Sequence, residues 1–404
     1  MNIGKKYKHG DMICIAVLLC ALLLSLGLIW HFTGMSPFLS NSYNSYTVQA
    51  LSWLEGRLDV DYRSWLELAE YEGKYYISFP PLPSLIMLPF AAVFGENTPD
   101  HLINLFFAFV TAVYAYKLAR HFGKDEKNAL FWSLFLTCGS NFLFIASLGW
   151  VWFMAQNMAF AFLMLSFYCA AKPDRGRGAL SLIFVALAVC CRPLDLAFIP
   201  GIMYILYKNC GSGSPVKGIT KKWYYLIAPA LIACALFAFN YIRFGSIFEF
   251  GHNYLPEFVN SPEGQFSLSY VPYNLFRCIR LFAWNGSKLS VPTFDGWCVF
   301  IVVPMLISIV SKGISTFIKE RHACVEGIIV VFGIAVNILM LCAHKTMGGW
   351  HFGNRYLIDF MPAVYYLYMK NSRVKCTAAY DVFLLIFGML INIGGTIAFY
   401  NGWI

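Results

Sequence analysis

Charged side chains are scarce in this chain of 404 residues. Asp, Glu, Lys and Arg make up 13% of it, whereas they make up roughly a quarter of a soluble domain. Apolar residues make up 59%, which is more apolar surface than a soluble core can bury. The composition therefore excludes a soluble globular protein and predicts an all-α polytopic membrane protein.

Paired cysteines and internal repeats are also lacking. The thirteen cysteines are an odd number and contain no Cys-x-x-Cys pair, so we interpret them as small apolar residues of helices. Neither a repeat nor a segment with the composition of a soluble domain is evident. We therefore expect residues 1–404 to form a single membrane-embedded domain.

Hydropathy predicts eleven transmembrane helices. No small-residue cleavage site follows the first apolar run, so we interpret that run as an uncleaved first helix and not as a signal peptide. The segments 179–191 and 194–207 are short enough to form one broken pair. The predicted spans are 12–30, 102–120, 129–147, 150–171, 179–191, 194–207, 223–242, 296–311, 324–342, 355–369 and 380–400.

The net charge of +9 is a topology signal and not a sign of nucleic-acid binding. Twenty of the 30 basic residues fall in one alternate set of short loops, which the positive-inside rule assigns to the cytoplasm. We expect a multi-pass protein of the plasma or inner membrane, with its N-terminus cytoplasmic and its C-terminus extracytoplasmic. The twenty are Lys5, Lys6, Lys8, Lys117, Arg120, Lys124, Lys127, Lys172, Arg175, Arg177, Lys208, Lys217, Lys221, Lys222, Lys312, Lys319, Arg321, Lys370, Arg373 and Lys375.

The first extracytoplasmic loop, residues 31–100, is where acids, aromatics and prolines crowd together. Residues 44–55 have apolar side chains at helical spacing, which predicts an interfacial helix. Prolines 80, 81 and 83 open a second apolar helix that ends at Gly95 and is too short to span a bilayer of about 30 Å. Between the two lie Asp59, Asp61, Glu67, Glu70 and Glu72.

Three further polar features fall on the same predicted face. Arg192 and Asp195 lie at membrane depth, where charge is costly unless it is paired or functional, and both readings stay open. A second outer loop, residues 244–295, carries Glu249, His252, Asn253, Tyr254 and Glu257, together with an amphipathic stretch that we interpret as an interfacial anchor. The third feature, residues 344–356, surrounds two glycine groups with Lys345, Trp350, His351 and Arg355.

These residue types fit one kind of chemistry at a membrane surface. A carboxylate can act as a general base on an acceptor hydroxyl. Lysine and arginine suit a phosphate, and arginine can hold two of its oxygens at once. The combination indicates transfer of a group from a lipid phosphate.

The order of features resembles the GT-C superfamily of integral membrane glycosyltransferases, which includes the bacterial protein O-mannosyltransferases and the aminoarabinose transferases. The resemblance is carried by Gly73-Lys74-Tyr75-Tyr76-Ile77-Ser78-Phe79-Pro80-Pro81, with Phe94-Gly95 closing the following helix. Two later phrases add to it: Asn240-Tyr241-Ile242-Arg243-Phe244-Gly245-Ser246 and Gly349-Trp350-His351-Phe352-Gly353-Asn354-Arg355-Tyr356.

The resemblance implies a polyprenyl-phosphate sugar as donor and a glycan, lipid or protein as acceptor on the outer face. It also implies a carboxylate base soon after the first span, but this chain has no acid between His31 and Leu54. We therefore predict that Asp61, Glu67 or Asp59 is the base, with Glu67 in a run able to insert as an interfacial helix. We expect Arg355, Lys345, Arg192 and Arg243 to bind the donor phosphate, and Tyr75, Tyr76, His252, Tyr254, Trp350, His351 and Asp195 to line the site.

Two other functions stay open. Many spans with buried charge also suit a transporter or flippase for a lipid-linked or small polar substrate, although the charges here gather in outer loops. The missing early acid keeps a non-catalytic envelope-assembly protein possible. His344 and His351 lack the spacing of a helix-face ligand pair, so we expect no divalent metal and no other cofactor.

Overall fold

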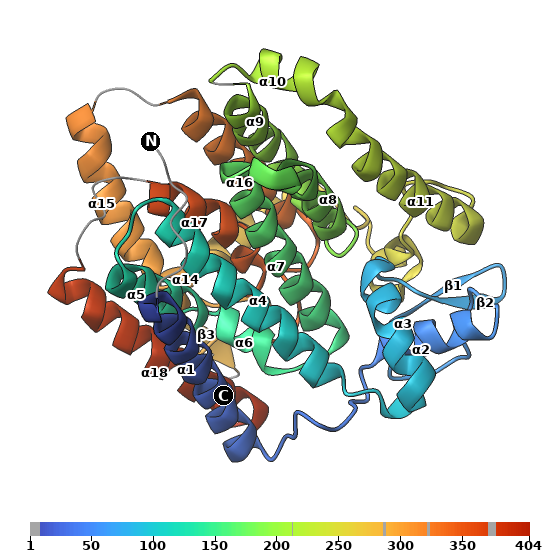
Figure 1. The fold of residues 1–404 in the computed structure, drawn as a ribbon. Helices are drawn as coiled ribbons and strands as arrows, with labels where there is room; N and C mark the ends of the chain where they lie inside the picture. The colour runs from blue at the N-terminus through green and yellow to red at the C-terminus, as the bar shows by residue number, and fades with distance from the viewer. Residues whose placement is uncertain (1–8, 212, 286–287, 321–323, 371–376) are drawn as a thin grey trace.

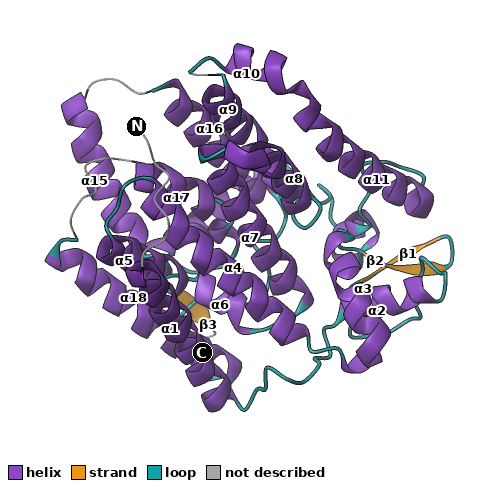
Figure 2. Cartoon of the chain, viewed as in Figure 1, coloured by secondary structure: helices purple, strands orange, loops and turns teal. Residues whose placement is uncertain are grey.

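The computed structural model describes residues 9–211, 213–285, 288–320, 324–370 and 377–404. Helices dominate these residues, and two short antiparallel hairpins accompany them (Figure 2). Part of the charge pattern used for the topology lies outside the described residues, namely Lys5, Lys6, Lys8, Arg321, Arg373, Lys375 and the side chains of Arg175 and Lys319.

All eleven predicted spans coincide with helices. Six helical segments are long and apolar enough to cross a membrane, which confirms the polytopic, mainly helical class, whereas the count of eleven stays a prediction. These six are α1 (His9–Thr33), α4 (Asp100–His121), α7 (Val151–Ala171), the run α10 (Pro215–Lys222), η4 (Trp223–Leu226) and α11 (Ile227–Phe244), α16 (Val325–Ala343) and α18 (Ala379–Tyr400).

The other predicted spans are shorter or broken helices. Span 129–147, for example, is interrupted at residues 138–141, because the chain turns there between two separate helices. The elements are α5 (Glu126–Thr137), α6 (Phe142–Ser147), η2 (Asp174–Gly176), α8 (Arg177–Val189), η3 (Pro193–Phe198), α9 (Ile199–Cys210), α14 (Val299–Val302), α15 (Met305–Glu320), η7 (Tyr356–Ile358) and α17 (Met361–Lys370).

Helix α7 is the centre of the bundle (Figure 1). It packs against α4, α8, α9 and α17, and its apolar window is completely buried. A helix that is apolar on every side is expected in such a position. Its N-terminal end, at Val151 and Trp152, reaches the polar loops described below.

The first and last helices end side by side. Asn401 donates its amide to the carbonyl oxygen of Phe32 (Nδ2–O 3.0 Å), so His9 and Ile404 lie at opposite ends of the bundle. Near His9, the carboxylate of Asp11 pairs with Arg120 (2.6 Å). This pair lies at the end of the bundle away from the first loop, where the positive-inside rule leads us to expect basic residues, and the membrane side of each end stays a prediction.

The first loop forms a small layer beside the C-terminal end of α11 (Figure 1). Its two predicted helices are confirmed as α2 (Ser45–Leu54) and α3 (Leu82–Phe94), and α3 continues into η1 (Gly95–Asn97). Between them, β1 (Leu68–Tyr71) pairs antiparallel with β2 (Lys74–Ile77). The expected interfacial helix around Glu67 is therefore wrong.

A tight turn explains why this segment is a hairpin. Glu72 and Gly73 both adopt positive φ, 51° and 72°, and two such residues make the two-residue turn that fits the twist of antiparallel strands. Val60 adds a further bridge to Tyr75 and is buried, so the segment around Asp59 and Asp61 is extended.

The second loop consists of short helices and strands that contact the third loop. Its elements are η5 (His252–Tyr254), α12 (Pro256–Val259), η6 (Leu268–Tyr270), α13 (Val271–Ile279), β3 (Ala283–Asn285) and β4 (Lys288–Ser290). Arg277 pairs with buried Asp295 (Nη1–Oδ2 2.8 Å). The same carboxylate accepts hydrogen bonds from the backbone N–H groups of Met347 and Gly349, each at 2.9 Å. Asp295 therefore fixes the glycine turn that precedes Arg355.

Candidate functional site

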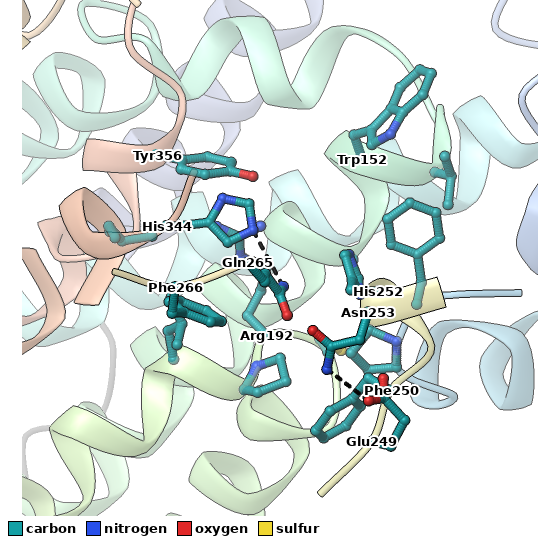
Figure 3. A pocket seen from close by; sticks show the side chains of 18 of the residues that line it. Trp152, Arg192, Glu249, Phe250, His252, Asn253, Gln265, Phe266, His344 and Tyr356 are labelled. Carbon is teal, nitrogen blue, oxygen red and sulfur yellow. Dashed lines mark hydrogen bonds between the residues drawn. The ribbon is translucent and has the colours of Figure 1, made fainter. Parts of the chain in front are cut away.

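The loops enclose two adjoining chambers at the end of the bundle where α1 and α18 end. The arginine chamber (Figure 3) has a volume of about 270 Å³, and the aromatic chamber has a volume of about 580 Å³. Six residues line both chambers and form the wall between them: Phe79, Trp152, His252, His344, Arg355 and Tyr356.

Glu67 places a carboxylate in the aromatic chamber. It lies directly before β1, and Ser78 donates to its carbonyl oxygen (3.2 Å), so the base of the hairpin fixes its backbone. Trp152 donates its indole N–H to the Glu67 carboxylate (Nε1–Oε1 3.1 Å). The side chain is open to the chamber but surrounded by protein. Glu67 is exposed to the solvent of the open chamber, but the protein around its carboxylate raises the pKa of Glu67. The Trp152 hydrogen bond opposes the rise, and the nearby Glu257 carboxylate adds to it.

Asp59 and Asp61 lie elsewhere, on the outer surface of the first loop. Both pair with Arg57, at 3.6 Å and 3.1 Å, and Lys74 lies 3.8 Å from Asp59. The hydrogen bond from Arg57 lowers the pKa of Asp61, whose side chain is 80% exposed. Neither acid lines either chamber. Of the three predicted bases, the structure brings only Glu67 to the cavity.

Arg355 is buried in the wall between the chambers. Its guanidinium donates to the carbonyl oxygens of Gly348 (2.8 Å) and Trp152 (3.4 Å), and Nε has no partner. Among the residues that the structure describes, no carboxylate forms a salt bridge with it. Gly348 has a φ of 106°, and a Cβ there would lie 2.8 Å from Arg355 Nε. The glycine turn thus makes room for the guanidinium.

Arg192 pairs with a residue that sequence spacing did not indicate. Its guanidinium meets Asp359 (Nη2–Oδ2 2.5 Å, Nε–Oδ2 3.1 Å) and lies over the ring of Tyr356. The possible pairing of Arg192 with Asp195 is therefore wrong. Asp195 is buried in η3 and lines neither chamber, whereas Arg192 lines the arginine chamber.

The other two predicted cations bind backbone carbonyl groups and do not line either chamber. Arg243 donates to the carbonyl oxygen of Ile77 (2.9 Å) and stacks on Phe239, which holds the end of β2 against α11. Lys345 donates to the carbonyl oxygen of Glu257 (2.5 Å). Neither residue is among those that line the cavity.

Some of the predicted lining residues line the chambers, and others do not. His252 lines both chambers, and Trp350 lines the aromatic chamber. The other four predicted side chains pack into neighbouring structure instead. Tyr75 packs on Tyr62, Tyr76 and Tyr254 pack on Phe244, and buried His351 bonds the carbonyl oxygen of Gly349 through Nδ1 (3.0 Å).

Several lining residues were not predicted as site residues. Tyr43 comes from the acid-free stretch after the first span, and Tyr356 directly follows Arg355 in one of the phrases quoted above. In the sequence, Glu257 and His344 are recognisable only as polar loop residues. Trp152 had no signal in the sequence, because it looks like any aromatic residue at the start of a span.

Two cavity histidines are held neutral by burial. Burial lowers the pKa of His344 to about 4 and that of His252 to about 3. His344 Nε2 lies 3.3 Å from the Gln265 amide, and Nδ1 lies 2.8 Å from the carbonyl oxygen of Thr346 (Figure 3). Within the described ranges no cluster of three or more His, Cys, Asp or Glu side chains is placed to hold a metal ion.

Comparison with known proteins finds likeness in structure only. No protein-family model matches the sequence, and no curated protein matches it. The structure of ArnT from Cupriavidus metallidurans bound to undecaprenyl phosphate matches with a TM-score of 0.53 and 13% identity, covering 94% of this chain and 62% of ArnT. The same protein in the apo state matches with a TM-score of 0.52 and 12% identity, covering 89% and 58%.

A weaker match is the oligosaccharyltransferase of Archaeoglobus fulgidus, with a TM-score of 0.43 and 13% identity over 95% of this chain and 55% of that one. The ArnT matches show that this chain shares the fold of ArnT over most of its own length, as the resemblance of its sequence to the GT-C superfamily implies. The chain spans about three fifths of the length of ArnT.

Proposed function

We propose that this protein is a glycosyltransferase that moves a sugar from a polyprenyl-phosphate donor to an acceptor hydroxyl on the extracytoplasmic face of the plasma or inner membrane. The observation that carries the proposal is that Glu67 and Arg355 line one cavity. A carboxylate base and a phosphate-binding cation are the two groups that this transfer needs.

In the proposed reaction Glu67 takes the proton of the acceptor hydroxyl. The hydroxyl oxygen forms a bond to the anomeric carbon of the sugar while the bond from that carbon to the phosphate oxygen breaks. The polyprenyl phosphate leaves with the electron pair of that bond, and Arg355 stabilises its growing negative charge. The base comes from the hairpin, which compensates for the absence of an acid between His31 and Leu54.

The charges of the arginine chamber favour a donor with a single phosphate. Asp359 already neutralises Arg192. The lining also contains Glu249, whose carboxylate accepts hydrogen bonds from Gly251 and Asn253. Arg355 is therefore the guanidinium left to balance an anion. Its fork geometry allows it to hold two oxygens of one phosphate. ArnT, whose fold this chain shares, has been solved bound to undecaprenyl phosphate, which supports a lipid of this class as the leaving group.

Arg355 is the residue that tests the proposal. We expect Arg355→Ala to abolish binding of a polyprenyl-phosphate sugar and transfer, and Arg355→Lys to restore them only in part, because lysine lacks the two-oxygen fork. Binding of a radiolabelled donor to the purified protein measures the first effect. Lys345→Ala is the matched control, because Lys345 lies outside both chambers. Parental donor binding in both Arg355 variants would disprove the proposed role.

A further inference from the structure

The aromatic chamber has a lining unlike that of the arginine chamber. Eleven of its twenty lining residues are Phe, Tyr or Trp. Tyr43 lies between two of these rings, with ring centroids 5.0 Å from Trp150 and 5.1 Å from Trp152. Trp350 contacts Phe294 at 5.2 Å but remains 70% exposed. Such a lining offers flat apolar faces to a ring-shaped ligand. It has few groups that could bind a charged group on that ligand.

The charges in this chamber are mostly negative. Its described lining contains two carboxylates, Glu67 and Glu257, and a single Lys or Arg side chain, Arg355, which lies in the wall shared with the arginine chamber. Burial raises the pKa of Glu257, and Lys345 opposes that rise. Two carboxylates in a confined site repel an anion and accept hydrogen bonds from hydroxyl groups.

We infer that the aromatic chamber binds the acceptor, and that the acceptor is a saccharide without acidic groups. The C–H face of a sugar ring is apolar and fits the face of Trp350, while its rim of hydroxyl groups reaches Glu67 and Glu257. This arrangement presents a hydroxyl to Glu67 on the side of the wall opposite the donor phosphate. The inference rests on the proposed function, because it names the second substrate of the same site.

The charge distribution argues against the other acceptor classes. A phosphorylated lipid headgroup in this chamber would place a second anion beside Glu67 and Glu257, where it is repelled. An extended peptide gains most from main-chain hydrogen bonds along a strand edge, and side chains of aromatic residues, not strand edges, form most of the lining. An acidic sugar, which carries an anion in place of the phosphate, and a peptide are therefore included in the test as competitors.

The experiment measures binding without any donor. Full-length protein in lipid nanodiscs is titrated with four probes under saturation-transfer NMR: cellobiose, chitobiose with free amines, cellobiouronic acid and a Ser/Thr-rich octapeptide. We expect the two acid-free sugars to bind at least about tenfold more tightly than the acid, because two carboxylates oppose it. Preferential binding of cellobiouronic acid or of the peptide would overturn the inference.

Variants identify the chamber as the binding site. Trp350→Ala should weaken cellobiose binding by about tenfold through loss of ring stacking. Trp284→Ala is its matched control, because Trp284 is 74% exposed and lies in β3, outside both chambers. Glu257→Lys should raise the affinity for cellobiouronic acid, and Glu257→Gln should raise it less. Equal cellobiose binding by Trp350→Ala and the parent would also overturn the inference.

Failure of this inference can be told apart from failure of the proposed function. Donor binding to the unmodified protein is measured in a separate titration with a polyprenyl-phosphate sugar. Sugar binding without donor binding would remove the transferase function and leave a saccharide-binding chamber. Donor binding together with a preference for the peptide or the acid would keep the transferase function and overturn the acceptor class.

Discussion

Trp152 donates its indole N–H to the carboxylate of Glu67 across 3.1 Å, which joins the first turn of the central helix α7 to the base of the β1–β2 hairpin. The backbone carbonyl of the same tryptophan accepts a hydrogen bond from Arg355. One residue thus contacts both the proposed base and the proposed phosphate ligand. The spacing of the two functional groups depends on α7, whose apolar window is completely buried.

Replacing the proposed base should stop turnover and spare donor binding. Glu67→Gln keeps the shape of the side chain but cannot accept a proton, so we expect a decrease in turnover of about 10²–10⁴-fold, the usual contribution of a general base. Radiolabelled donor should bind as in the parent. Asp61→Asn and Asp59→Asn are the controls, since both acids pair with Arg57 outside the cavity. Turnover at the parental level in Glu67→Gln would show that the base lies elsewhere.

The pH dependence of turnover should report the environment of Glu67. The base is active when deprotonated, so turnover rises with pH through the pKa of Glu67, which loss of hydration inside the chamber raises above that of an ordinary glutamate. The Trp152 hydrogen bond favours the charged form and lowers this pKa. Trp152→Phe should therefore move the acid limb of the profile to higher pH. An unchanged limb in this variant, measured with saturating donor, would argue against Glu67 as the titrating group.

Much of the fold could be predicted because its signals are local. Each of the eleven segments that hydropathy marked coincides with helix, and the prolines before α3 marked its start. The hairpin was missed because the acids around Glu67 hid the alternation of β1 and the Glu72–Gly73 turn. The apolar residues on either side of Glu67 nevertheless indicate where its side chain points. Leu66 and Leu68 are buried, so the side chain between them faces the chamber.

The site itself was harder to predict because its contacts are long-range. Arg192 meets Asp359 167 residues further along the chain, and no spacing rule joins them. Trp152 approaches Glu67 only because α7 and the first loop pack at the same end of the bundle. Arg243 and Arg355 occur in sequence motifs that resemble the GT-C superfamily equally well. Arg243 nevertheless holds a strand in place, whereas Arg355 lines the cavity. Only the packing of the helices separates these roles.

The contributions of Arg192 and Asp359 to the stability of the protein should be coupled. Both side chains are largely buried, at 17% and 4% exposure, and breaking such a pair from one side typically costs about 3–5 kcal/mol because a charge is left without its partner. We expect Asp359→Asn and Arg192→Gln each to lower the midpoint of thermal unfolding in detergent. The double variant should lose much less than the sum of the two. Strictly additive losses in this double-mutant cycle would show that the pair is not coupled.

The sidedness of the chain is the last expectation open to a direct test. Because α1 and α18 end together, the first loop and Ile404 should lie on one side of the membrane and residues 209–220 on the other. A protease site inserted after Gly56 should be cut when protease is added to intact cells, whereas a site inserted after Ser214 should be protected, and a reporter fused after Ile404 should be active outside. The basic residues flanking Ser214, Lys208 and Lys217, give the physical reason, since cytoplasmic loops retain such charges. If the Gly56 site is cut from outside but the reporter signals from the cytoplasm, the number of crossings is even and the prediction of eleven spans is wrong.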